Sequence, residues 1–194
     1  MKKGTVILTI AGVLALGTGA FLTKGKKAAN EALKWEGMEE LGNNEAFKNK
    51  EFQKKMQEAG FKKGYEWCVI FVKMVWLNVF KQDVDLIKKL ISPSSMQTWK
   101  NFSNTASLQG KFARIDVQSK PKAGDIVIWQ RKGSPAKGHA GLITQVNEDL
   151  SFKTIEGNTN EDGSANGYGV FIKENSPLSS NRKSFILLGF LRKL

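Results

Sequence analysis

The segment from Cys68 to Phe80, which reads CVIFVKMVWLNVF, constrains the fold of this 194-residue chain more than any other feature. Every residue from Val69 to Phe80 is apolar except Lys73 and Asn78. A helix at a protein surface carries a single apolar stripe, so this density predicts a helix that is buried on most sides. The rest of the chain must therefore surround this helix.

The pattern changes from helical to extended after Pro121. Before it, a basic linker at 24–34 is expected to lead into a helix from Glu31 to about Leu41, and a second helix is expected from Glu45 to Ala59. Ser94 and Gln97 have the spacing of a capping box, which predicts another helix start. Helices followed by an antiparallel sheet are the layout of an α+β fold, which we therefore expect. The segments with strand character are 125–131, 140–147, 151–158, 168–174 and 185–192.

The N-terminal region contains an uncharged stretch, 4–23, between Lys2–Lys3 and a basic cluster at 24–27. A helix of this length spans about 30 Å at ~1.5 Å per residue, which is the thickness of a bilayer core. We therefore expect a transmembrane anchor with basic flanks in residues 1–27, followed by one domain in residues 28–194. The alternative is a secretory signal peptide cleaved near Ala20, where GTGA supplies small residues. Lysines flank both ends, so the orientation of the anchor stays open.

The chain is strongly basic, with 30 Lys and Arg against 18 Asp and Glu and a formal net charge of +12. Such a surface favours anionic partners, namely nucleic acid, anionic lipid or a cell-wall polymer, although charge also serves solubility alone. A nucleic-acid-binding protein would interleave its lysines with exposed aromatic residues. Here the lysines are scattered and the aromatic residues lie in apolar runs, so no specific nucleic-acid partner is expected. The single cysteine excludes an internal disulfide and argues against a structural zinc site.

The segments 140–147 and 151–157 predict a β-hairpin closed by NEDL. If its loop centres on Glu148–Asp149, the numbers of opposed residues sum to 297, so His139 faces Asn158 and Gly141 faces Glu156. Side chains alternate along a strand, which places His139, Glu156 and Asn158 on one face with room beside the glycine. A loop one residue longer or shorter would break this register.

Cys68 is the only cysteine and His139 the only histidine of the chain. A thiol at a helix start has a lowered pKa because the unpaired amide groups there carry partial positive charge. A thiolate beside an imidazole that a third polar group orients is the arrangement of cysteine hydrolases. The competing interpretation is a cysteine that only fills the core and a histidine with a structural role. Asp125, in AGDIVIW, is interpreted as a turn residue at the start of a strand rather than as a catalytic acid.

Four motifs in this order, EWC, PKAGDIVIW, GHAGLI and TIEGN, resemble the CHAP amidase/peptidase domains of the papain-like NlpC/P60-type superfamily. The chain is most similar to CHAP-like proteins with an N-terminal E-x-G-x-x-E-x-x-GN pattern, here WEGMEELGNN at 35–44. The similarity covers roughly residues 30–194. It implies a papain-like fold, with N-terminal helices packed on an antiparallel sheet, here preceded by one transmembrane helix.

The resemblance implies that Cys68 is the nucleophile, His139 the general base, Glu156 the group that orients the imidazole, and Asn158 a further polar group of the site. The backbone N–H of Cys68 would help to bind the oxyanion. Two aromatic residues before the cysteine, Tyr65 and Trp67, either bind substrate in the cleft or pack in the core. Some members of the family bind calcium just upstream of the cysteine. Because GFKKGYEWC offers only Glu66 as an acidic residue there, no metal and no cofactor are expected.

The function expected from these observations is a membrane-anchored peptidoglycan hydrolase. It would cleave an amide bond of the cell-wall peptide as an N-acetylmuramoyl-L-alanine amidase or an endopeptidase, with its catalytic domain facing the wall or within a virion membrane. A phage lysis or entry protein, a bacterial wall-remodelling enzyme and a secreted effector all fit this architecture. The alternative is a non-catalytic structural or binding protein on the same fold, such as a membrane-associated virion component. The bond that is cut and the oligomeric state are not indicated by any motif.

Overall fold

The computed structural model describes residues 22–160, 167–175 and 183–194. Most of the predicted anchor, residues 1–21, lies outside these described residues. Within them, no helix combines the length and the apolar character that crossing a membrane requires. The first described helix spans Lys24–Leu33, so nearly all of the segment 24–34 is helical where a linker was expected.

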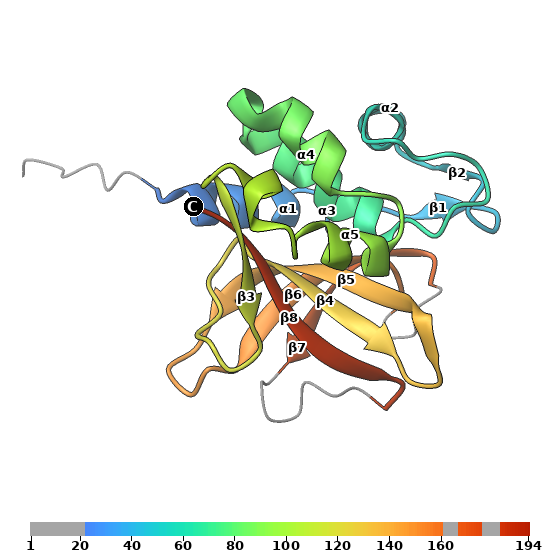
Figure 1. Ribbon diagram of the computed structural model, residues 1–194. Coiled ribbons are helices and arrows are strands. Elements are labelled where there is room, and N and C mark those ends of the chain that lie inside the picture. The colour runs from blue at the N-terminus through green and yellow to red at the C-terminus, as the bar shows by residue number, and fades with distance from the viewer. Residues whose placement is uncertain (1–21, 161–166, 176–182) are drawn as a thin grey trace, which may run out of the picture.

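The protein is built from helices that cover one face of an antiparallel sheet (Figure 1), which confirms the predicted α+β class. The six strands lie in the order β3-β8-β4-β5-β6-β7. A short pair, β1 and β2, forms a separate two-stranded sheet, and Glu39, just before β1, makes an isolated bridge to Gly169 of β7. The helices are α1 (Lys24–Leu33), α2 (Lys50–Glu58), α3 (Cys68–Val79), α4 (Val84–Leu90) and α5 (Ser95–Asn101). The strands are β1 (Glu40–Leu41), β2 (Ala46–Phe47), β3 (Phe112–Asp116), β4 (Ile126–Arg131), β5 (Ser134–Val146), β6 (Phe152–Thr159), β7 (Gly169–Asn175) and β8 (Phe185–Lys193).

Several boundaries differ from those expected. Strand β3 was not anticipated, because it precedes Pro121 and carries polar residues at alternate positions. The expected helix at 31–41 ends at Leu33, and the one expected from Glu45 starts only after Asn49, whose side chain accepts the N–H of Phe52. By contrast, the hydroxyl of Ser94 accepts the N–H of Gln97, as the capping box predicted.

Helix α3 is the centre of the molecule. Its residues from Cys68 to Val72 and from Met74 to Trp76 are buried, as the sequence predicted. The helix contacts α1, α2 and α4 as well as strands β5 and β6, so one cluster of apolar side chains surrounds it. A second apolar cluster, which includes Val127, Trp129 and Phe190, covers the opposite face of the sheet. Both faces of the sheet are therefore buried.

Helix α1 is held against the domain by a contact between two glycines. A Cβ atom on Gly124 would lie 2.4 Å from the Cα of Gly25, and one on Gly25 would lie 2.1 Å from the carbonyl oxygen of Ala123. Gly124 also has a φ of +88°, which favours glycine, and its carbonyl accepts the indole N–H of Trp76 at 3.2 Å. These contacts leave no room for a side chain where α1 crosses the turn before β4.

We expect the Gly124→Ala variant to lose about 2–4 kcal/mol of unfolding free energy, because a methyl group there is both strained and overpacked. The matched control is Gly133→Ala, which shares a positive φ of +71° but has no atom within 4 Å of the added Cβ. It should lose only about 1–2 kcal/mol. Urea unfolding followed by circular dichroism measures both. Equal losses would contradict a close contact at Gly124.

Candidate active site

Cys68 is the first residue of α3 and is only 6% exposed. The residue before it, Trp67, provides no side-chain cap, so the first amide groups of the helix carry their partial positive charge toward the thiol. Cys68 borders a groove of about 410 Å³ that is open to solvent. The walls of this groove are formed by Gly64–Glu66, Pro93–Ser95 and Ala136–Gly138.

His139 and Glu156 come from neighbouring strands, β5 and β6. Leu142 pairs with Ile155 and Ile143 with Thr154, so the register beside the site is the predicted one. Gly141 accordingly lies against Glu156, since a Cβ atom on Gly141 would be 2.7 Å from the Cγ of Glu156. The imidazole Nε2 of His139 lies 3.0 Å from Glu156 Oε2, and both side chains are almost fully buried.

Cys68 contacts the same imidazole through a hydrogen bond. Because Nε2 faces Glu156, the ring nitrogen that remains for the sulfur is Nδ1. Burial by itself lowers the pKa of His139, but the negative charge of the Cys68 thiolate, the hydrogen bond with Cys68 and the contact with Glu156 outweigh it and raise the pKa to about 9. At neutral pH the imidazole of His139 is therefore protonated, between the sulfur of Cys68 and the carboxyl group of Glu156.

Two residues that the sequence analysis did not single out support this row. Thr154 is fully buried and its hydroxyl donates a hydrogen bond to Glu156 Oε1, so both carboxylate oxygens are engaged. Trp129 pairs with His139 across β4 and β5, and its ring stacks on the imidazole with centroids 5.9 Å apart. The alternation of TIEGN places Thr154 on the face of Glu156, which is the signal that would have identified it.

Asn158 is buried on β6 two residues after Glu156, with a left-handed φ of 54° that asparagine tolerates. Its Oδ1 has no hydrogen-bond partner among the described residues. Between the two, Gly157 packs against the rings of Trp67 and the side chain of Phe71, where a Cβ atom would come within 2.6 Å of Trp67. The structure thus brings Cys68, His139 and Glu156 into contact and places Asn158 beside them on the same strand, without a hydrogen bond from it to the imidazole in the described part of the chain.

The two aromatic residues before Cys68 lie in different surroundings. Tyr65 is 40% exposed and lines the groove. Trp67 is fully buried, so its predicted place in the substrate cleft is wrong and the packing alternative holds. Its ring meets Phe47 edge to face at 4.9 Å, and its indole N–H donates to Glu40 Oε2 at 2.8 Å.

The segment WEGMEELGNN, at 35–44, contacts Trp67, the residue before Cys68, and holds it in place. Besides the indole of Trp67, Glu40 accepts the N–H of Asn44 at 3.2 Å through its other oxygen. The carbonyl of Asn44 in turn accepts the N–H of Gly64 at 2.7 Å, at the start of the segment that forms one wall of the groove. The segment therefore supports Cys68 from behind. In the described part of the chain, no three His, Cys, Asp or Glu residues cluster closely enough to hold a metal ion.

The single histidine allows the pKa of His139 to be measured directly by NMR of the labelled imidazole. We expect its titration midpoint near pH 9 in the native protein, because the Cys68 thiolate and Glu156 favour the charged ring. In Cys68→Ser, which preserves the packing and removes the thiolate, the midpoint should move to lower pH. A native midpoint at the ordinary histidine value of about 6.5, or equal midpoints in both proteins, would contradict the ion pair.

The chain is similar to a known protein family and to a solved structure. A solved structure titled "The crystal structure of Ly7917" is similar with a TM-score of 0.48 and 14% sequence identity, over 88% of this chain and 63% of that one. The chain thus spans less than two thirds of that protein. The search of curated proteins found no match. The sequence model of the CHAP domain matches residues 60–158, a range that contains Cys68, His139, Glu156 and Asn158. CHAP domains are typically amidases or peptidases of peptidoglycan, and this chain belongs to the CHAP family.

Proposed function

We propose that the protein is a cysteine hydrolase that cleaves an amide bond of the cell-wall peptide, with Cys68 as the nucleophile. The observation that carries this proposal is the contact of Cys68 with the His139–Glu156 pair beside an open groove. A cysteine that only filled the core would need neither a solvent-accessible groove nor a buried imidazolium next to it. A buried charge of that kind is costly unless it is paired, and here Glu156 Oε2 lies 3.0 Å from the ring and Cys68 hydrogen-bonds to it.

The reaction would proceed in two steps. The thiolate of Cys68 attacks the amide carbonyl, and the amide groups at the start of α3, including that of Cys68, stabilise the oxyanion. The tetrahedral adduct expels the amine, which takes its proton from Nδ1 of His139, and a thioester remains. The now neutral His139 removes a proton from water, the resulting hydroxide attacks the thioester, and the acid leaves as the thiolate reforms.

Glu156 would act through the imidazole rather than on the substrate. By accepting the N–H at Nε2 it fixes the ring orientation and leaves Nδ1 directed to the sulfur. Its second oxygen is held by Thr154, which prevents the carboxylate from turning away. Asn158 would add a polar group beside this row.

The groove offers groups that suit a peptide with charged ends. Glu66 and Lys137 line it from two different segments, and both are exposed without an ion pair in the described part of the chain. Wall peptides carry both carboxylates and amines, and the net charge of +12 favours an anionic wall. We further propose that the uncharged stretch 4–23 anchors the protein in a membrane, with the domain on the side of the wall. A role in phage lysis is compatible with this arrangement.

Hydrolysis is tested on isolated sacculi with the full chain in neutral detergent, beside Cys68→Ala and Cys68→Ser. The native protein should release muropeptide fragments, whose masses identify the bond, and both variants should lose about 10³-fold or more of the rate. The full chain is required because truncation at residue 30 would remove Ala28 and Ala29 from the core. Release at equal rates by all three proteins would refute Cys68 as nucleophile. No release by any folded protein across several wall types would favour the non-catalytic alternative.

The pH dependence follows from the raised pKa of His139. The ring must carry a proton to protonate the leaving amine, so the rate should fall as pH rises through about 9. In Glu156→Gln, the loss of the carboxylate lowers the pKa of His139, so the rate should drop by about 10²-fold or more and the alkaline limb should move to lower pH. Thr154→Val serves as the comparison, since it keeps the charge and should change the rate less. An unmoved limb in Glu156→Gln would exclude a role for Glu156 through the imidazole.

A further inference from the structure

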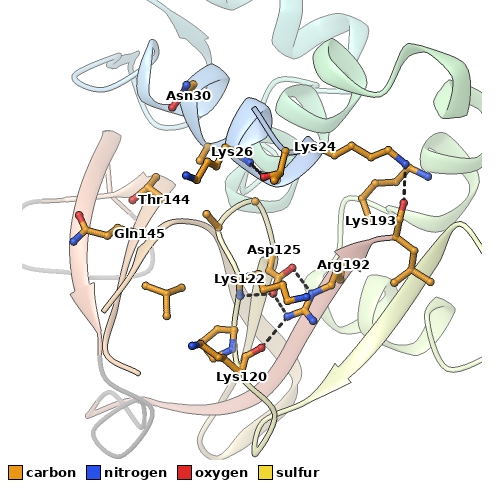
Figure 2. A pocket seen from close by; sticks show the side chains of 18 of the residues that line it. Lys24, Lys26, Asn30, Lys120, Lys122, Asp125, Thr144, Gln145, Arg192 and Lys193 are labelled. Atoms are coloured by element: carbon orange, nitrogen blue, oxygen red, sulfur yellow. Dashed lines mark hydrogen bonds and ion pairs between the residues drawn. The ribbon is translucent and has the colours of Figure 1, made fainter. Parts of the chain in front are cut away.

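A second and larger pocket, of about 810 Å³, lies where the described chain begins (Figure 2). It is formed by the start of α1, the turn at 120–125, the end of β5 and the end of β8. The groove beside Cys68 shares none of its lining residues. Its polar and charged lining residues include Lys24, Lys26, Asn30, Lys120, Lys122, Asp125, Thr144, Gln145 and Arg192.

The pocket carries an excess of positive charge that the protein itself does not neutralise. Lys26, Lys120 and Lys122 are exposed, and their ammonium groups make no ion pair with any residue of the described chain. The other three cations are engaged: Lys24 donates to the main-chain oxygen of Leu194, Arg192 is paired with Asp125, and Lys193 is paired with Asp83. Asp125 is the one acidic side chain among the described lining residues, and this pair neutralises it.

The wall that carries two of these lysines is held in place before any ligand binds. Arg192 donates two hydrogen bonds, of 2.9 and 2.6 Å, to the carboxylate of Asp125 and a third to the carbonyl of Lys120. Asp125 also accepts the N–H of Lys122 at 2.8 Å. A fixed turn loses little conformational entropy on binding, which favours recognition by its lysines. This role of Asp125 also confirms its interpretation as a turn residue.

The lining is not polar throughout. Ala29, Phe80, Pro121, Ala123 and Val146 contribute apolar surface between the lysines. A small inorganic anion would pair with the ammonium groups and leave this surface uncovered. A phosphate that carries a glycerol and acyl chains would cover both parts.

The position of the pocket selects among such ligands. Thr23 and Lys24 line it; Thr23 is the last residue of the uncharged stretch 4–23, for which we proposed a membrane anchor, and Lys24 directly follows it. Lysines at this place would lie at the membrane surface, where anionic lipids attract basic side chains. We propose that the pocket binds the phosphate headgroup of an anionic phospholipid. This inference goes beyond the proposed hydrolysis, does not involve Cys68, and rests on the proposed anchor only for the choice of a lipid over a soluble phosphate.

The test is an NMR titration of the full ¹⁵N-labelled chain in neutral detergent with dihexanoyl-phosphatidylglycerol. Saturable shifts are expected at the amides of residues 23–26 and 122–125, with an affinity that falls as salt is added. Dihexanoyl-phosphatidylcholine, glycerol phosphate and inorganic phosphate are titrated in parallel and should bind more weakly. Equal binding of the phosphatidylcholine would reduce the site to an apolar pocket, and equal binding of glycerol phosphate or inorganic phosphate would make it a site for soluble phosphates. Either result, or no saturable shift, overturns the proposal.

The double variant Lys26→Gln/Lys122→Gln should weaken phosphatidylglycerol binding about tenfold or more, because it removes two charge-assisted contacts. Lys54→Gln/Lys62→Gln is the matched control, since both lysines are exposed, lie outside the pocket and change the net charge equally. Unaltered binding by the first variant, or equal loss in both, would refute a specific site. Cys68→Ala should bind as the native chain does, so failure of the hydrolase proposal and failure of this one are separate results.

Discussion

The contact between α3 and strands β5 and β6 is the interaction on which the candidate site depends. Cys68 belongs to the helix, and His139 and Glu156 belong to the sheet, so no single element contains the site. Gly157 makes the contact as close as it is, because a Cβ atom there would lie 2.6 Å from the ring of Trp67 and 2.8 Å from the Cβ of Phe71. The apolar cluster around α3 fixes the helix in this position. A small shift of the helix along the sheet would separate sulfur and imidazole without unfolding anything.

The same packing buries the charged groups of the site, and the loss of hydration costs free energy. His139 and Glu156 are buried nearly completely, and an ion pair in such surroundings is stable only when its remaining hydrogen-bonding groups are satisfied. Thr154 engages the second carboxylate oxygen, and Trp129 and Phe185 enclose the imidazole. The imidazole is only 2% exposed, and the exclusion of water strengthens its electrostatic interactions with Glu156 and Cys68. The hydrolytic chemistry that we propose uses this enclosure and the groove that Cys68 borders.

The predictable parts of the structure are those with a strong local signal. The burial of α3 follows from its apolar density, and the contact of His139 with Glu156 follows from alternation in a hairpin. That prediction nevertheless succeeded through two errors that cancel. The pairs nearest the loop, Gln145 with Lys153 and Val146 with Phe152, are offset by one from the assumed register, and a bulge at Thr144 restores it before the site. Strand β3 and the position of Trp67 could not be read from the sequence, because they depend on long-range partners: β8 for the strand, and Glu40 with Phe47 for the indole.

The close crossing of α1 over Gly124 fixes the position of this helix on the rest of the domain. The helix packs on α3 and β5, the two elements that supply Cys68 and His139, and the two glycines meet without any side chain between them. The start of α1 at Lys24 is therefore held in a fixed position relative to Cys68 and His139. If the stretch before it is fixed in a bilayer, the groove stands at a set height and a set angle above that surface. A hydrolase of the kind that we propose would then reach only the part of the wall that lies at that distance from the membrane.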